Sequence, residues 1–215
     1  MPSASRSLSA LERDIKRLRR QLLPPVFDPT NNYKNGKAVQ AKTRAFLVLA
    51  HAEFESYFEE WARELSKVAH AVWKKSYRVV SPLEFLIATY PKHVAAAQKI
   101  SATPADDMPA KFAAHLEAIV SGYLEAVNEN NGIKEANVAA LFGRLGIPAA
   151  TFGTTLLPAL TAYGERRGKH VHNSAAWVAV VLVLDPQDEF SRALNMITEL
   201  KPLHAWFVAS RKKIH

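Results

Sequence analysis

The chain of 215 residues contains no cysteine. This absence excludes disulfide bonds, zinc sites built from thiolates and catalysis by a cysteine nucleophile, and it is compatible with a reducing cytosol. The sequence also lacks any apolar run near the roughly 20 residues that a membrane helix needs. Its N-terminal stretch, MPSASRSLSALERDIKRLRRQL, has no apolar segment of the kind found in secretory signals. We therefore expect a cytoplasmic protein with no membrane partner.

Several motifs that carry well-known chemistry are absent as well. The sequence has no H-E-x-x-H and no pair of carboxylates at the Glu-x-x-His spacing of di-iron proteins. It has no G-x-x-x-x-G-K-[ST] or G-x-G-x-x-G loop to hold phosphates, and no G-x-S-x-G nucleophile elbow. We therefore predict no metal and no cofactor.

The charge of the chain is unbalanced toward the basic side. Lys and Arg total 28 against 20 Asp and Glu, which gives a net charge of +8 and a pI of about 9.7. A basic excess attracts polyanions, of which nucleic-acid backbones are the commonest. The composition is otherwise that of a globular protein, and the length fits one domain.

The N-terminal residues 1–37 are predicted to form a basic helix and loop. Residues 7–22 place leucines and an isoleucine on one stripe and Arg and Lys on the other face. Pro24 and Pro25 end the pattern, and a loop rich in Pro, Asn and Gly follows. The basic face has two interpretations, a set of solvated charges on a packed helix or an arm that contacts a polyanion.

Residues 38–210 carry the main helical domain. Apolar residues recur at steps of three and four in five segments, 38–76, 110–129, 134–145, 153–167 and 189–210. The aromatic stripe at 54–61 is predicted to be core, whereas WVAVVLVL at 177–184 fits a buried strand or a buried helix equally well. The pattern predicts an all-α fold, a single-domain helical bundle with short connections.

The stretch GERRGKHVHNS, residues 164–174, carries the candidate chemistry. Arginine offers a permanent, planar cation for phosphate oxygens, and histidine transfers protons near neutral pH. In a continuous helix, Arg167 and His172 lie about 140° apart with a rise of about 7.5 Å, whereas Arg166 and His170 share one face. An ordinary solvated helix end is the alternative interpretation for these residues.

Three further segments give this motif a context. They are TRAFLVLAHAEFESYFEEWAREL (43–65), NNGIKEANVAALFGRLGI (130–147), and DPQDEF (185–190) before a final amphipathic pattern. Together with ERRGKHVHNS (165–174), they resemble the HEPN superfamily, in particular the branch named RiboL-PSP-HEPN. An Arg, four to six residues and then a His is the hallmark of that superfamily. The resemblance covers roughly residues 40–209.

The resemblance implies a helical bundle of HEPN type and a metal-independent endoribonuclease. It implies a homodimer in which two copies of the motif form one composite site, with Arg167 as phosphate stabiliser and His172 as acid/base. Such proteins resemble toxins or antiphage effectors, so an antitoxin or regulatory protein is an expected partner besides RNA. Arg166, Lys169 and His170 are expected to bind RNA phosphates, and Glu165 to orient a base.

One departure from the family pattern keeps an alternative open. The residue after the motif arginine is usually polar, such as Asn, but here it is Gly168. The alternative is a non-catalytic HEPN module that binds RNA, a nucleotide or a partner protein.

The Arg-to-His spacing also occurs twice in the first long helical segment, at Arg44–His51 and at Arg63–His70. We interpret His51 and His70 as helix residues with no functional role. For Glu53 and Glu55 we favour a solvated helix face over an orienting role toward the motif.

Overall fold

The computed structural model describes residues 7–90, 104, 106–172 and 183–214, with the backbone alone at 171 and 172. All regular structure in this part of the chain is helical, as predicted. The elements are α1 (Leu8–Leu22), α2 (Gly36–Ser76), α3 (Ser81–Thr89), α5 (Met108–Asn128), α6 (Glu135–Gly143), the 3-10 helix η1 (Ala149–Phe152), α7 (Gly153–His172) and α9 (Pro186–Ile214). Across the described ranges, none of the helices combines the length and apolar character needed to cross a membrane.

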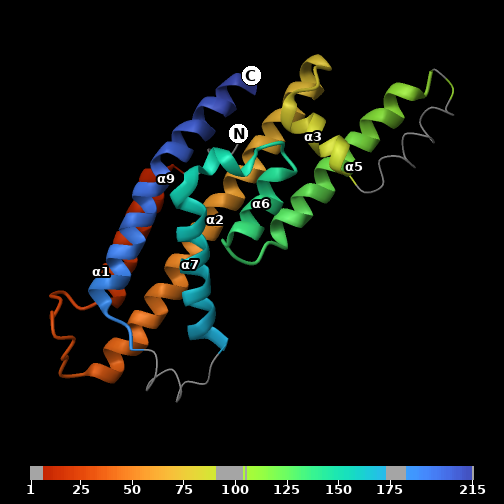
Figure 1. Ribbon diagram of the computed structural model, residues 1–215. Coiled ribbons are helices and arrows are strands. Elements are labelled where there is room, and N and C mark those ends of the chain that lie inside the picture. Colours follow the sequence, from red (N-terminus) through yellow and green to blue (C-terminus); the bar gives the residue numbers. More distant parts are fainter. Residues whose placement is uncertain (1–6, 91–103, 105, 173–182, 215) are drawn as a thin grey trace.

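Helix α2 organises the molecule. It has 41 residues, and α1, α3, α5, α6, α7 and α9 all pack against it (Figure 1). Its inward stripe is the aromatic one, since Phe54, Tyr57, Phe58 and Trp61 are each at most 1% exposed. The prediction that this stripe forms core is therefore confirmed.

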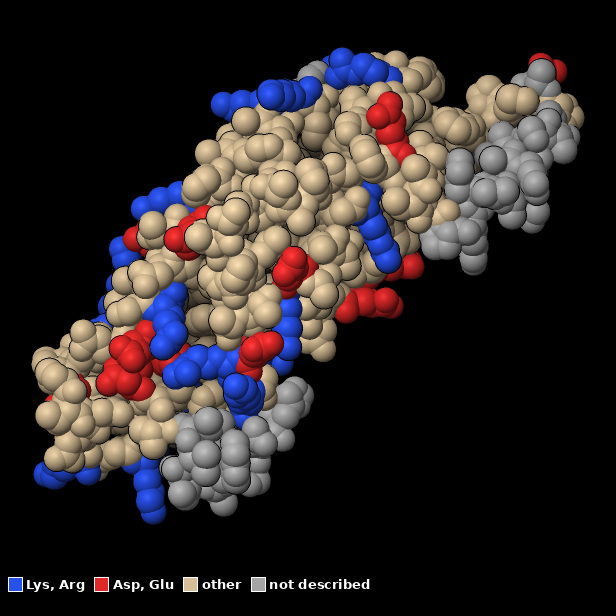
Figure 2. Space-filling view, in the orientation of Figure 1, with Lys and Arg blue, Asp and Glu red and all other residues tan. Residues whose placement is uncertain are grey.

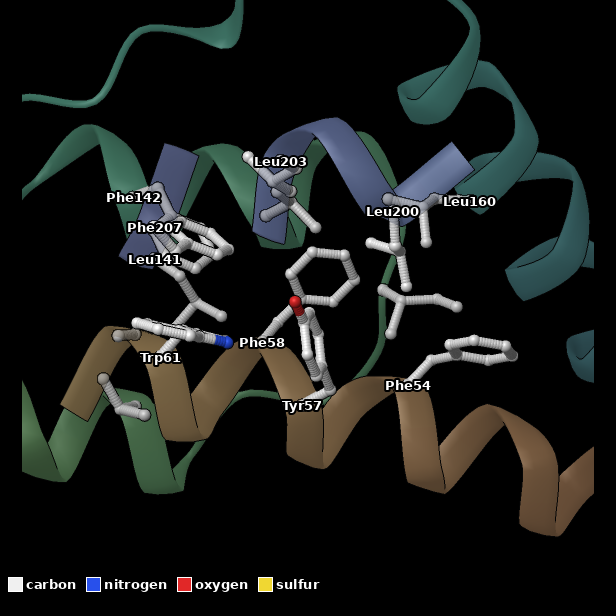
Figure 3. Packing of buried hydrophobic residues seen from close by; sticks show 14 of the residues in the cluster. Phe54, Tyr57, Phe58, Trp61, Leu141, Phe142, Leu160, Leu200, Leu203 and Phe207 are labelled. Carbon is white, nitrogen blue, oxygen red and sulfur yellow. The ribbon is translucent and has the colours of Figure 1, made fainter. Parts of the chain in front are cut away.

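Aromatic rings from three helices meet in the middle of that core. Phe207 of α9 stacks on Trp61 of α2 at 5.0 Å between ring centroids and on Phe142 of α6 at 5.1 Å (Figure 3). Each such ring buries a large apolar area, and the packed pairs add to the stabilisation from burial. This contact ties the C-terminal helix to the centre of the chain.

The N-terminal helix α1 belongs to the same core. Its N-cap Ser7 accepts a hydrogen bond from the backbone N–H of Ala10 at 3.1 Å, and Leu11 and Ile15 are fully buried. The helix packs against α2 and α9. The predicted helix over 7–22, with its leucine stripe inward, is confirmed.

The residues that lead into α9 are also defined. Leu184, the last residue of WVAVVLVL, is buried, and both its backbone groups bind the Gln40 side chain, at 2.7 and 2.8 Å. The Asp185 carboxylate accepts from the backbone N–H of Gln187, and Pro186 stands at the first position of α9. Residues 177–182, for which strand and helix were both open, lie outside the described residues.

Helix α7 is longer than the predicted 153–167. It continues through Gly168 to His172, with Pro158 inside it. The backbone of the whole RRGKHVH motif is therefore on one helix.

Candidate functional site

Arg166 and Arg167 are adjacent on α7 but face different neighbours. The guanidinium Nε of Arg166 donates to Oε1 of Glu189 at 2.7 Å, and the Glu189 side chain is fully buried at the start of α9. Arg192 lies further away, with its Nε 3.9 Å from the same oxygen. A buried carboxylate needs a close cation, so Arg166 is held in a structural ion pair between α7 and α9.

Arg167 faces a polar cavity instead. The cavity has a volume of about 320 Å³, and its lining residues come from α2, the turn after α5, the start of α6, and α7. They are His51, Asn131, Gly132, Lys134, Asn137, Gly164, Arg167 and Gly168. The Nε of Arg167 is buried, and no described residue accepts a hydrogen bond from it.

His51 forms part of the same cavity, opposite Arg167. Its side chain is only 4% exposed, and its ring stacks on Tyr163 at 6.5 Å between centroids. Burial, reinforced by the positive charge of Arg167, lowers the pKa of His51 to about 4. The imidazole is therefore uncharged at neutral pH, and it offers one hydrogen-bond donor and one acceptor.

Gly164 allows α7 to approach these residues closely. A Cβ atom at this position would stand 3.0 Å from Cγ of Lys134 and 3.8 Å from Nε2 of His51. A Cβ there would crowd the Lys134 side chain and would meet the His51 ring at ordinary van der Waals distance. The absence of a side chain at Gly164 therefore lets α7 lie close to Lys134 and His51. At Gly168, which also lines the cavity, a Cβ would meet nothing within 4 Å.

Two glutamates of α2 bind the turn after α5, which contributes Asn131 and Gly132 to the lining of the cavity. Glu55 accepts a hydrogen bond from the backbone N–H of Gly132, and burial raises the pKa of Glu55. Glu59 accepts from Nδ2 of Asn130 at 3.2 Å. The interpretation of Glu55 as part of a solvated face is therefore wrong, because its carboxylate is engaged with the turn that carries the NGI segment.

The remaining predicted site residues lie elsewhere on α7. Glu165 and Lys169 are exposed, and His170 is partly buried. Nδ1 of His170 is buried with no acceptor or donor among the described residues, and burial, Arg166 and Arg44 lower its pKa. The side chain of His172 lies outside the described residues, so the pairing of Arg167 with His172 stays a prediction.

Sequence reasoning missed His51 as a neighbour of Arg167. The two residues lie on different helices, so no spacing rule connects them. A usable signal was nevertheless present, since His51 falls four residues after Leu47 and three before Phe54, two fully buried residues. A histidine on the inward stripe of a core helix must face either a packed core or a cavity.

Charges of both signs surround this region. Figure 2 shows Lys and Arg interspersed with Asp and Glu over the lower part of the molecule, where α7 ends in Figure 1. Within the described ranges, no group of three or more His, Cys, Asp or Glu side chains is arranged to hold a metal ion. Comparisons of the chain with protein-family models, with curated proteins and with solved structures found no match.

Proposed function

We propose that this chain is a metal-independent endoribonuclease of HEPN type that acts as a homodimer. The observation that carries the proposal is the position of Arg167. Arg167 lines a polar cavity, and no described residue accepts a hydrogen bond from its buried Nε, whereas the adjacent Arg166 is committed to Glu189. An arginine that lines a cavity and is not committed to a buried carboxylate is suited to bind an anionic ligand.

In the proposed reaction, RNA supplies its own nucleophile. The 2′-hydroxyl gives its proton to a base, and its oxygen attacks the adjacent phosphorus while the bond from phosphorus to the 5′-oxygen breaks. The leaving 5′-oxygen takes up a proton, so the products are a 2′,3′-cyclic phosphate and a 5′-hydroxyl. Arg167 stabilises the charge on the phosphorane, and His172 is the acid/base.

The other motif residues have supporting roles in this proposal. Lys169 and His170 contact RNA phosphates, and Glu165 orients a base. Arg166 contributes mainly by fixing α7 against α9, because its ion pair with Glu189 occupies the guanidinium. The toxin or antiphage role, with an antitoxin or regulatory partner, would show as growth arrest when the chain is expressed alone.

The test is RNA cleavage by the purified chain in excess EDTA, with the new ends identified. We expect 2′,3′-cyclic phosphate ends, and a rate lower by about 10²–10³ in Arg167→Ala and about 10²–10⁴ in His172→Ala. Matched controls are Lys75→Ala, which removes an exposed cation at the end of α2, and His115→Ala on α5. Cleavage unchanged in both motif variants would overturn the assignment.

A second candidate function is a non-catalytic module that binds RNA, a nucleotide or a partner protein. Gly168 favours it, because a Cβ there would meet nothing within 4 Å and the residue supplies no polar side chain beside Arg167. RNA binding that depends on Arg167, without cleavage under any condition tested, would select this alternative.

A further inference from the structure

The cavity beside Arg167 contains two kinds of polar groups. Arg167 and Lys134 are cations, whereas His51, Asn131 and Asn137 carry neutral donors and acceptors. A simple phosphate site needs only the first kind. The second kind suits the edge of a nucleobase, which presents its own neutral donors and acceptors.

We propose that this cavity binds the RNA nucleotide whose 3′-phosphate is cleaved, with Arg167 and Lys134 on the phosphate and His51 and Asn137 on the base. The identity of the nucleotide as part of an RNA rests on the proposed function. The inference adds a base-selective subsite built from α2 and the start of α6, outside the RRGKHVH motif.

The size and depth of the cavity fit this ligand. Its volume of about 320 Å³ lies at the lower end of the range for small-molecule pockets. His51 is buried, while Lys134 and Asn131 are exposed. A ligand can therefore enter past exposed residues and reach a buried imidazole.

The uncharged state of the His51 imidazole also fits a role in hydrogen bonding to the base. The lowered pKa keeps the imidazole uncharged, so the ring acts through hydrogen bonds rather than as a second cation. Charged groups that face it are Arg167 from α7 and Glu55 from α2, the latter with Oε2 at 3.9 Å from Nδ1. A buried polar group that selects a base edge discriminates strongly, because the wrong base leaves it unpaired.

The orientation of Asn137 is set by its neighbours. Its Nδ2 donates to the backbone oxygen of Asn131 at 3.4 Å, and its Oδ1 lies 3.3 Å from the point where a Cβ on Gly132 would stand. The positive φ of Gly132, +127°, is one that other residues rarely adopt. Because Gly132 has no Cβ, the space next to the Asn137 amide stays open.

The test is calorimetric titration of the full chain with each of the four nucleoside 3′-monophosphates and with inorganic phosphate. We expect at least one nucleotide to bind about tenfold more tightly than phosphate, since two neutral hydrogen bonds supply a factor of this order. Arg167→Ala should weaken binding of both kinds of ligand. His51→Gln and Asn137→Ala should lower the ratio of nucleotide to phosphate affinity, and Asn195→Ala, exposed on α9, is the matched control.

Two results would overturn the subsite. One is that no nucleotide binds more tightly than phosphate, and the other is that Asn137→Ala and His51→Gln, both folded by circular dichroism, keep the ratio of the unaltered chain. Failure of the proposed function looks different. Nucleotides would then bind with the expected dependence on these residues, while RNA would remain uncleaved in EDTA.

Discussion

His51 is the residue for which the structure changes the interpretation most. Its pKa is about 4 in the folded chain against an ordinary value of 6.5. Between these values an unfolded chain binds a proton at His51 that the folded chain does not, so acidification favours unfolding. We predict that His51 lowers the free energy of unfolding by up to about 3 kcal/mol as the pH falls from about 6.5 to about 4, and contributes no slope above that range.

Urea unfolding at pH 7.5 and pH 4.5 measures this effect. The loss of stability on acidification should be smaller in His51→Gln than in the unaltered chain or in a His115→Gln control. His70, His170 and His204 also have lowered pKa values and remain in every variant, so they produce a common background of the same sign. An equal loss in all variants would show that His51 is protonated normally in the folded chain.

The different contacts of Arg166 and Arg167 could not be predicted from the sequence, for a physical reason. Neighbouring residues on a helix point about 100° apart, so one contacts α9 and the other the cavity beside α2. Which is which depends on Glu189, a carboxylate 23 residues further along the chain that looks in the sequence like one more charge at a helix start. The motif predicted the basic cluster, and the tertiary contacts separated its members.

At the scale of the elements, the turn after α6 contains a position, Gly146, that favours glycine for two separate reasons. Gly146 has φ +74°, and it closes α6 together with a hydrogen bond from the N–H of Ile147 to the oxygen of Phe142 at 3.0 Å. A Cβ at this position would also overlap the ring of Phe85. The contact of Gly146 with Phe85 of α3 was not foreseen from the sequence.

Gly153 provides a matched comparison, since it has φ +73° and a Cβ there would meet nothing within 4 Å. We predict that Gly153→Ala costs about 1 kcal/mol of stability through backbone strain alone. Gly146→Ala should cost about 2–4 kcal/mol, because displacement of Phe85 adds to the same strain. Equal midpoints of urea unfolding for the two variants would mean that Phe85 moves aside freely.

Apart from α3 and η1, which no predicted segment covered, the helices followed from local patterns. Apolar steps of three and four predicted α1, α2, α5 and α6 to within a few residues, because each buries one stripe against α2 or its neighbours. The C-terminal end of α7 and both ends of α9 were placed too far inside. Gly168 weakens a helix only slightly, so it did not end α7. Pro186 is favoured at a first helical position, and α9 begins there rather than at the predicted residue 189.

At the scale of the whole molecule, two of the proposals make different demands on assembly. The described residues that line the cavity belong to one chain, so nucleotide binding requires a single folded copy. The proposed endoribonuclease activity, in contrast, requires two motif copies facing each other. Binding and cleavage should therefore respond differently to dilution.

We predict that sedimentation at high concentration gives a species of about twice the 23.9 kDa of one chain. On dilution into the range where monomers dominate, the cleavage rate per chain should fall in proportion to the dimer fraction, while the nucleotide affinity per chain stays constant. This contrast arises because mass action removes the second motif copy without altering the cavity in the first. A cleavage rate per chain that stays constant while sedimentation shows only monomers would assign the complete active site to one chain, and His51 would then become the first candidate for the acid/base beside Arg167.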